Sequence, residues 1–272
     1  MGRYFSNNRL LDKLTKGKYL PILDRIKQDD DLRIELRIKN QVKVYYKKSL
    51  VLTLFPIRKP KLLSVGYWKG VTPPVLELKS PELYFETAKN LIDIHKRDVK
   101  GNKEFEIQQK IAKDNASLRN KFLILDMEFQ FSQEKLKIRT KQNTRFDLVG
   151  YNVGNNKILL LELKQGMNAL SGASGVDDHY SRFFEHTRHP QFQSDVRKDV
   201  KGILWSKQQL GLIDFDANKF LQRIDEAEID YAFVFAAYSE DEMQRYKQQY
   251  GEKYRTLYLN AQADTYTLKE GI

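Results

Sequence analysis

The stretch Arg145–Gly166, RFDLVGYNVGNNKILLLELKQG, decides the fold predicted for this chain. Its two apolar runs, residues 145–152 and 157–164, flank a turn made of Val, Gly and two Asn residues. Gly and Asn supply the positive φ angles that a tight β-hairpin needs. If the loop is centred on residues 154 and 155, Asp147 of the first strand lies directly opposite Glu162 of the second.

Facing carboxylates in an otherwise apolar hairpin repel each other, and such a pair calls for a cation. Lys164 follows Glu162 by two residues, so it projects from the same face of the strand. Mg²⁺ prefers oxygen ligands and is usually held by one or two protein carboxylates. A bound ion of this kind activates water and stabilises charge on a phosphoryl oxygen. We therefore expect Mg²⁺ or Mn²⁺ at Asp147 and Glu162.

The alternative is a solvated strand, on which Glu and Lys commonly alternate. Residues 158–161 are apolar at every position, however, which indicates a central strand buried on both faces. Asp147 likewise lies between Phe146 and Leu148. Charged side chains at the ends of buried strands are costly, and such clusters often mark functional sites. The sequence therefore favours a site over a solvated strand.

Asp147 on one strand, followed by Glu162-Leu163-Lys164 on the next, resembles the core motif of the PD-(D/E)XK nuclease superfamily. The resemblance covers about residues 101–240. It implies an α/β restriction-endonuclease-like core with a mixed central β-sheet flanked by helices. It also implies that Asp147, Glu162 and the backbone carbonyl of Leu163 bind the metal, while Lys164 positions and polarises the attacking water. One departure is Phe146, where the family pattern has Pro.

The same resemblance implies a further acid on the helix before the first core strand. Glu104 and Glu106 are the candidates on the predicted helix 103–115, although an acidic first turn is also favoured by the helix macrodipole. Glu128, in the predicted strand 122–131, is another candidate.

Related nucleases often carry Gln on the helix that follows the motif. Gln191 and Gln193 of the predicted helix 191–210 are candidates to line the site, as is Gln165 directly after the motif.

Three histidines, His179, His186 and His189, precede this helix. A phosphate-contacting surface is favoured over a His-rich metal site, because Pro190 breaks the helical spacing. The Gly/Ser-rich stretch 171–175 is either a mobile element over the site or a surface connection.

Composition excludes several classes of protein. The chain has 272 residues, of which 41% are hydrophobic and 31% charged, as in a soluble globular protein. No apolar run approaches the ~18 residues of a membrane span. The absence of cysteine excludes disulfides, thiolate catalysis and iron–sulfur clusters. We expect a cytoplasmic protein without a membrane partner.

The positive charge is concentrated at one end of the sequence. Residues 1–100 contain 22 Lys and Arg against 11 Asp and Glu, whereas residues 101–272 contain 25 of each, so the first hundred residues carry the whole net charge of +11. This asymmetry predicts two domains: a basic α+β domain over residues 1–100 that contacts nucleic acid, and a nuclease-like domain over residues 101–272.

Within the first domain, we expect helices over residues 3–28, then a small antiparallel sheet over 31–39, 42–47 and 50–55. The alternation in 31–39 places Arg33, Glu35 and Arg37 on a solvated outer face. Aromatic rings beside basic residues can stack on bases, although Trp68 could simply cover the sheet. The predicted nucleic-acid contacts are Arg33, Arg37, Lys43, Lys47, Arg58, Lys59, Lys61, Trp68 and Arg145.

The expected function is that of a metal-dependent endonuclease that hydrolyses phosphodiester bonds, most readily in double-stranded DNA. Two alternatives stay open: a catalytically inactive nucleic-acid-binding or assembly protein on the same fold, and an RNA-directed nuclease. Many such nucleases cut both strands as homodimers, and a dimer would suit this chain.

Overall fold

The chain forms two compact units in the computed structural model, which describes residues 2–47, 49–64, 67, 80–96, 103–130, 145–166, 169–172, 175–236, 239–250, 253–259 and 265–270. The N-terminal unit comprises Met1–Glu106 and Gly202–Asp214, and the C-terminal unit comprises Ile107–Lys201 and Phe215–Ile272. Helix α7 (Pro190–Gln209) contributes residues to both units.

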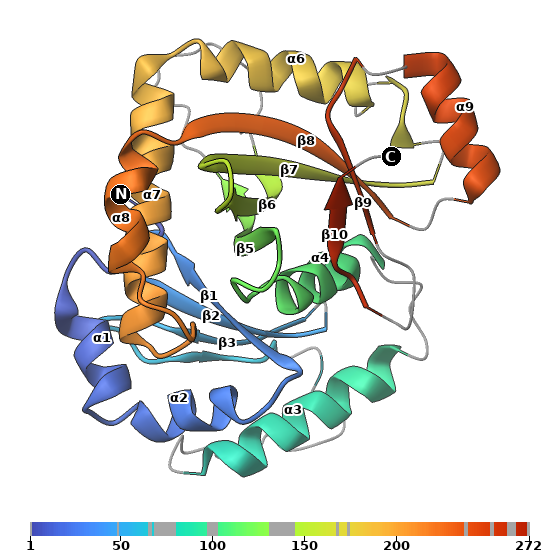
Figure 1. The fold of residues 1–272 in the computed structure, drawn as a ribbon. Helices are drawn as coiled ribbons and strands as arrows, with labels where there is room; N and C mark the ends of the chain where they lie inside the picture. Colours follow the sequence, from blue (N-terminus) through green and yellow to red (C-terminus); the bar gives the residue numbers. More distant parts are fainter. Residues whose placement is uncertain are drawn as a thin grey trace. The chain divides into compact units, whose positions relative to one another are not determined.

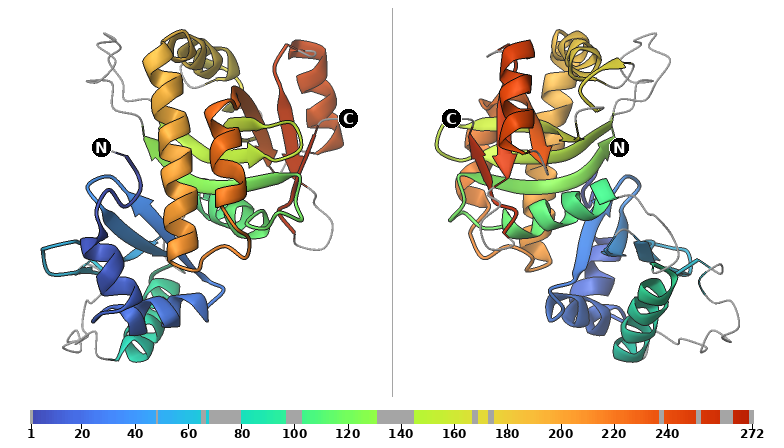
Figure 2. Two further views of the ribbon diagram at one scale, coloured as in Figure 1. Left: turned by 60° about the vertical axis from the view of Figure 1, so that its left-hand side comes forward. Right: turned by 90° about the vertical axis from the view of Figure 1, so that its right-hand side faces the viewer.

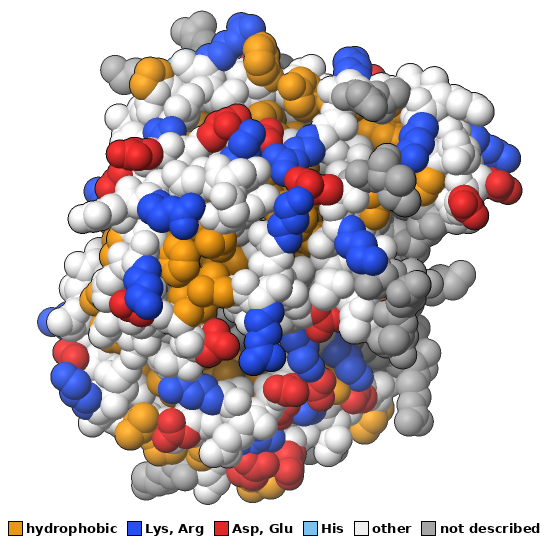
Figure 3. All heavy atoms as spheres, in the orientation of Figure 1, with side chains coloured by type: hydrophobic (Ala, Val, Ile, Leu, Met, Phe, Trp, Pro, Cys, Tyr) orange, Lys and Arg blue, Asp and Glu red, His pale blue; other side chains and the backbone are white. Residues whose placement is uncertain are grey.

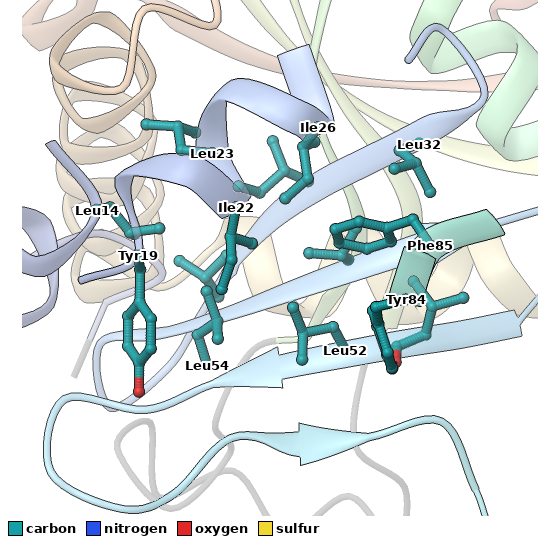
Figure 4. Close-up of a cluster of buried hydrophobic side chains, with 14 of the residues drawn as sticks. Leu14, Tyr19, Ile22, Leu23, Ile26, Leu32, Leu52, Leu54, Tyr84 and Phe85 are labelled. Atoms are coloured by element: carbon teal, nitrogen blue, oxygen red, sulfur yellow. The ribbon is translucent and has the colours of Figure 1, made fainter. Parts of the chain in front are cut away.

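The N-terminal unit packs helices on one face of an antiparallel sheet. Its helices are α1 (Asn8–Thr15), α2 (Leu20–Lys27) and α3 (Pro81–Lys96), and its strands, in spatial order, are β1 (Leu32–Arg37), β2 (Gln41–Tyr46), β3 (Ser49–Leu54) and β4 (Lys61–Leu62). The helices bury apolar side chains such as Ile22 and Phe85 against Leu52 and Leu54 of the sheet (Figure 4). The predicted helices and antiparallel strands of this unit are confirmed.

The other face of this sheet differs from the prediction. Arg33, Glu35 and Arg37 were expected to face solvent, but Glu35 is fully buried and Arg37 is only 8% exposed. Glu35 Oε1 lies 2.7 Å from Arg33 Nε, and its Oε2 lies 3.8 Å from Lys207 Nζ on α7. The prediction of a solvated outer face on β1 is therefore wrong, because a buried carboxylate surrounded by cations occupies it.

A mixed sheet flanked by helices forms the C-terminal unit (Figure 1). Its strands, named in chain order, are β5 (Phe122–Gln130), β6 (Arg145–Asn152), β7 (Lys157–Gln165), β8 (Glu228–Ala236), β9 (Thr256–Leu259) and β10 (Leu268–Glu270). The strands lie side by side in the order β10-β9-β8-β7-β6-β5. The pairs β7–β8 and β8–β9 are parallel, and the other neighbouring pairs are antiparallel. The predicted mixed α+β architecture is confirmed, whereas the specific restriction-endonuclease-like core stays a prediction.

The helices of this part of the chain agree with the sequence pattern in most places. They are α4 (Lys103–Asp114), α6 (Val176–Thr187), α8 (Asn218–Asp225) and α9 (Glu240–Tyr250), with the first residues of α7. Helix α6 was not predicted from the sequence. None of the described helices is long and apolar enough to cross a membrane.

The β6–β7 hairpin forms in the predicted register. Leu148 pairs with Leu161 and Asn152 pairs with Lys157, so facing residues keep the offset that the turn residues indicated. In the turn, Asn152 Oδ1 accepts hydrogen bonds from the N–H groups of Gly154 and Asn155, and Asn156 adopts a φ of 56°. The turn chemistry therefore fixes which side chains meet at the open end of the hairpin.

Candidate active site

Asp147 lies just beyond the last regular pair of the hairpin. The β6–β7 ladder ends at Leu148 and Leu161, and Asp147 Oδ2 then accepts a hydrogen bond of 2.7 Å from the backbone N–H of Leu163. A side-chain carboxylate thus binds the neighbouring strand where regular backbone pairing ends. This bond holds Asp147 next to Glu162 and Lys164, because Leu163 is the residue between them.

Glu162 and Lys164 meet at the same end of β7. Lys164 Nζ lies 3.5 Å from Glu162 Oε1, and Nδ1 of His179, on α6, lies 2.7 Å from the same oxygen. Asp147, Glu162 and Lys164 are 4%, 7% and 4% exposed. Charged groups this deeply buried are costly unless they are paired, so the contacts among them are needed for the fold to tolerate the cluster.

An aromatic cluster lies near the carboxylates, with Tyr231 close enough to feel their charge. Tyr231 of β8 stacks on Phe183 of α6, with ring centroids 4.6 Å apart, and also contacts Phe146. Burial raises the pKa of the Tyr231 hydroxyl well above its usual value, and the negative charges of Glu162 and Asp147 raise it further. Tyr231 therefore stays neutral beside the two carboxylates and adds no charge to them.

Two acids of β5 differ in their environments. Glu128, which was a candidate, has a φ of 52° and its Oε2 lies 2.7 Å from Arg145 Nη1. Asp126, which sequence reasoning missed, is 1% exposed and pairs in the ladder with Val149 of β6. Asp126, unlike Glu128, is a buried carboxylate on the strand next to Asp147.

Glu104 and Glu106 lie in the first turn of α4 and belong to the N-terminal unit. Their first-turn position is the one that the macrodipole favours. Their part in a metal site stays a prediction.

His179 is the second residue that the sequence reasoning did not assign to the site. The sequence does hold a signal for its position: Val176, His179 and Phe183 recur at helical spacing and share one face of α6. His186 is fully buried and its Nδ1 lies 2.6 Å from the carbonyl oxygen of Arg182, whereas His189 is exposed. The three histidines therefore have three different environments.

The candidate glutamines of α7 form local contacts. The amide of Gln191 donates to Asp195, and that of Gln193 donates to the carbonyl oxygen of Thr187. Neither bond involves Asp147 or Glu162, so a site-lining role for these glutamines stays a prediction. Gln165 ends β7 and is half-buried.

The predicted nucleic-acid contacts are unevenly exposed. Arg58, Lys59 and Lys61 are exposed, and Lys43 is half-buried. Lys47 Nζ lies 2.6 Å from Asp93 Oδ1, while Trp68 lies outside the described residues. On the face drawn in Figure 3, Lys and Arg side chains are interspersed with Asp and Glu.

The donor set of the site suits a hard divalent cation. Two buried carboxylates are what Mg²⁺ usually takes from a protein, with water or phosphate oxygens completing its shell. Across the described residues, no group of three or more His, Asp and Glu side chains is close enough to hold a metal. Asp147 and Glu162 could anchor Mg²⁺ as a carboxylate pair, and the Leu163 carbonyl as a further ligand stays a prediction.

Comparison with known protein families, with curated proteins and with solved structures finds no match to this chain.

Proposed function

We propose that this protein is a metal-dependent nuclease of the PD-(D/E)XK type, with DNA as its substrate. The observation that carries the proposal is the hydrogen bond from Leu163 N–H to Asp147, which holds this acid beside Glu162 and Lys164 at the buried end of a hairpin. The parallel strand β8 beside β7 and the helices that flank the sheet support the same assignment.

Each side chain has a distinct task in this proposal. Asp147 and Glu162 would hold Mg²⁺ or Mn²⁺, which when bound supplies Lewis-acid stabilisation of a phosphoryl oxygen. Lys164 orients the attacking water, and its ammonium stabilises negative charge that develops on the phosphate. His179 fixes the carboxylate of Glu162 through a contact of 2.7 Å.

Burial gives these charges their effect. Asp147, Glu162 and Lys164 are buried, and electrostatic interactions are stronger in such a medium than in solvent. The carboxylates are also pre-positioned, so little reorganisation is needed when the substrate arrives.

The test is cleavage of plasmid, linear duplex and single-stranded DNA with Mg²⁺ or Mn²⁺ added, and with chelator as the blank. We expect metal-dependent cutting by the parent and loss of cutting in Glu162→Gln, which removes the charge but keeps the shape of the side chain. Glu226→Gln is the matched control, because Glu226 is an exposed acid in the same unit.

A folded Glu162→Gln protein that cuts as fast as the parent would overturn the proposal. Equal loss in Glu226→Gln would point to a contaminating nuclease or to general charge effects rather than to this site. RNA substrates of the same lengths separate DNA from RNA preference.

The second candidate is a nucleic-acid-binding protein that has lost catalysis. The observation that favours it is that, in the described part of the chain, no group of three or more His, Asp and Glu side chains is arranged to hold a metal. This candidate predicts salt-dependent DNA binding, weakened at high ionic strength, without cleavage at any metal concentration.

A further inference from the structure

The C-terminal unit has a basic pocket apart from the candidate active-site residues. Helices α7 and α8 lie side by side (Figure 2), and a pocket of about 280 Å³ is lined by Ser194, Arg197, Lys198, Lys201 and Asp225. Ser194 and Lys201 each lie three or four positions from the adjacent pair Arg197 and Lys198, so the four residues share one side of the helix. Asp225 is the last residue of α8.

Two of the three cations are held in place by contacts at the edge of this pocket. Arg197 Nε donates to the carbonyl oxygen of Ala227 at 2.9 Å, and its Nη2 donates to Gln193 Oε1 at 3.4 Å. Lys201 Nζ lies 2.6 Å from Asp225 Oδ2. These bonds use two of the five N–H groups of the guanidinium and set the direction of the others.

Ser194, Lys198 and Asp225 are exposed, whereas Arg197 and Lys201 are half-buried. The side chain of Lys198 forms no hydrogen bond or ion pair within the described part of the chain. The pocket therefore gathers three cationic side chains and a hydroxyl against one carboxylate, and that carboxylate already contacts Lys201.

We propose that this pocket binds a phosphate group. Guanidinium, ammonium and hydroxyl groups are all donors, and the planar fork of Arg matches the oxygens of a phosphate. The volume is below that of pockets for drug-sized ligands, which suits a phosphate with a small attached group. Neither Asp147 nor Glu162 lines the pocket, so the phosphate-binding proposal can be tested independently of the proposed nuclease activity.

The phosphate could come from two sources with the same chemistry, a small phosphorylated molecule or the terminal phosphate of a nucleic-acid strand. We would titrate the full chain in chelator with inorganic phosphate and pyrophosphate, and separately with a short oligonucleotide that carries either a 5′-phosphate or a 5′-hydroxyl. Calorimetry or backbone NMR shifts of α7 residues report the binding.

The sharpest test compares a variant that loses a positive charge with a variant that loses a negative charge. Lys198→Ala removes an exposed cation and should weaken phosphate binding about fivefold. Asp225→Asn removes the carboxylate and releases Lys201, and should strengthen binding by a similar factor. Lys219→Ala is the matched control, because Lys219 is an exposed lysine on α8 outside the lining, and it should leave binding unchanged.

Saturable binding of phosphate that follows this order supports the proposal. A preference for the 5′-phosphate strand over inorganic phosphate identifies a nucleic-acid end as the source, and the reverse identifies a small molecule. The proposal is overturned if the parent shows no saturable binding of either probe, or if Lys219→Ala weakens binding as much as Lys198→Ala.

Discussion

Each of the two units buries a group of charged side chains, and the two groups have opposite compositions. In the N-terminal unit, one carboxylate, Glu35, lies within 4.0 Å of Arg33, Arg37 and Lys207. In the C-terminal unit, Asp147 and Glu162 lie beside one ammonium, Lys164, and one imidazole. The negative charge of a buried acid surrounded by cations is neutralised within the fold. A pair of acids that share a lysine has capacity for a further cation.

This contrast separates a structural role from a functional one. Removal of one partner from a balanced buried group leaves uncompensated charge, which costs stability. An acid-rich group is costly for folding in itself, and the proposed metal-dependent function would account for its presence here. The Glu35 group should therefore control stability, and the Asp147 group should control activity.

The largest expected effect is on activity. Asp147→Asn should lower metal-dependent cleavage about 1000-fold, because the amide cannot supply the negative charge that the metal needs. Its amide oxygen can still accept from Leu163 N–H, so the fold should be preserved. Cleavage rates and thermal unfolding of the same preparation check both statements, and loss of folding together with activity would break the contrast.

The next effect is on stability. Glu35→Gln should lower the free energy of unfolding of the N-terminal unit by about 3 kcal/mol, because three buried or half-buried cations lose their counter-charge. Trp205 of α7 belongs to this unit, so denaturant unfolding followed by tryptophan fluorescence reports on it. Glu86→Gln, at an exposed position of the same unit, is the control. An unchanged midpoint in Glu35→Gln would show that the group does not stabilise the fold.

A smaller effect is expected from His179. His179→Ala removes the contact that fixes Glu162, so the Mn²⁺ concentration for half-maximal cleavage should rise about 10-fold. The maximal rate at saturating metal should change less, because His179 holds a ligand and does not itself contact the substrate. His189→Ala, an exposed histidine, should match the parent. A lower rate at every metal concentration would instead mean a direct catalytic role.

The smallest effect concerns Asp29, a half-buried acid of the N-terminal unit with two cationic partners, Lys89 and Arg25. Burial acts to raise the pKa of its carboxyl, but hydrogen bonds from Lys89 and Arg25 outweigh burial and lower it below 3.8. A lowered folded-state pKa adds stability above the unfolded-state pKa, which is lost as the pH falls through the folded value.

Asp29→Asn should therefore cost about 1 kcal/mol at pH 7, and this difference from the parent should shrink as the pH falls below about 4. Tryptophan-monitored unfolding at several pH values measures the difference. Asp24→Asn, at an exposed position of α2, should show no such trend. A difference that stays constant with pH would assign the effect to packing rather than to charge.

The sequence predicts the features that rest on local chemistry. The hairpin register follows from Gly154 and the Asn residues of the turn, and the apolar run of β7 marks a strand buried on both faces. Together these place Asp147, Glu162 and Lys164 at one end of the hairpin. Their metal-binding and catalytic roles stay predictions, because register carries no information on whether a site is active.

The features that the sequence does not predict depend on distant contacts. Polar and apolar residues alternate in β1 as they would in a strand with one solvated face. Lys207, however, lies 172 positions after Glu35 in the chain, so the sequence around β1 does not predict their contact. Similarly, the contact of His179 with Glu162 depends on the packing of α6 against the sheet. The positive φ of Glu128 is a backbone irregularity in a strand that reads as regular.

The composition of the N-terminal unit has a consequence for synthesis on the ribosome. Its first 106 residues emerge long before residues 202–214, which supply Lys207 to Glu35 and Leu210 to the hydrophobic core. While nearly a hundred further residues are translated, the carboxylate of Glu35 therefore lacks Lys207, and the hydrophobic core of the N-terminal unit lacks Leu210. Because domains generally fold as units during synthesis, we expect this unit to reach its native state only after the end of α7 leaves the exit tunnel, and to need protection from aggregation until then.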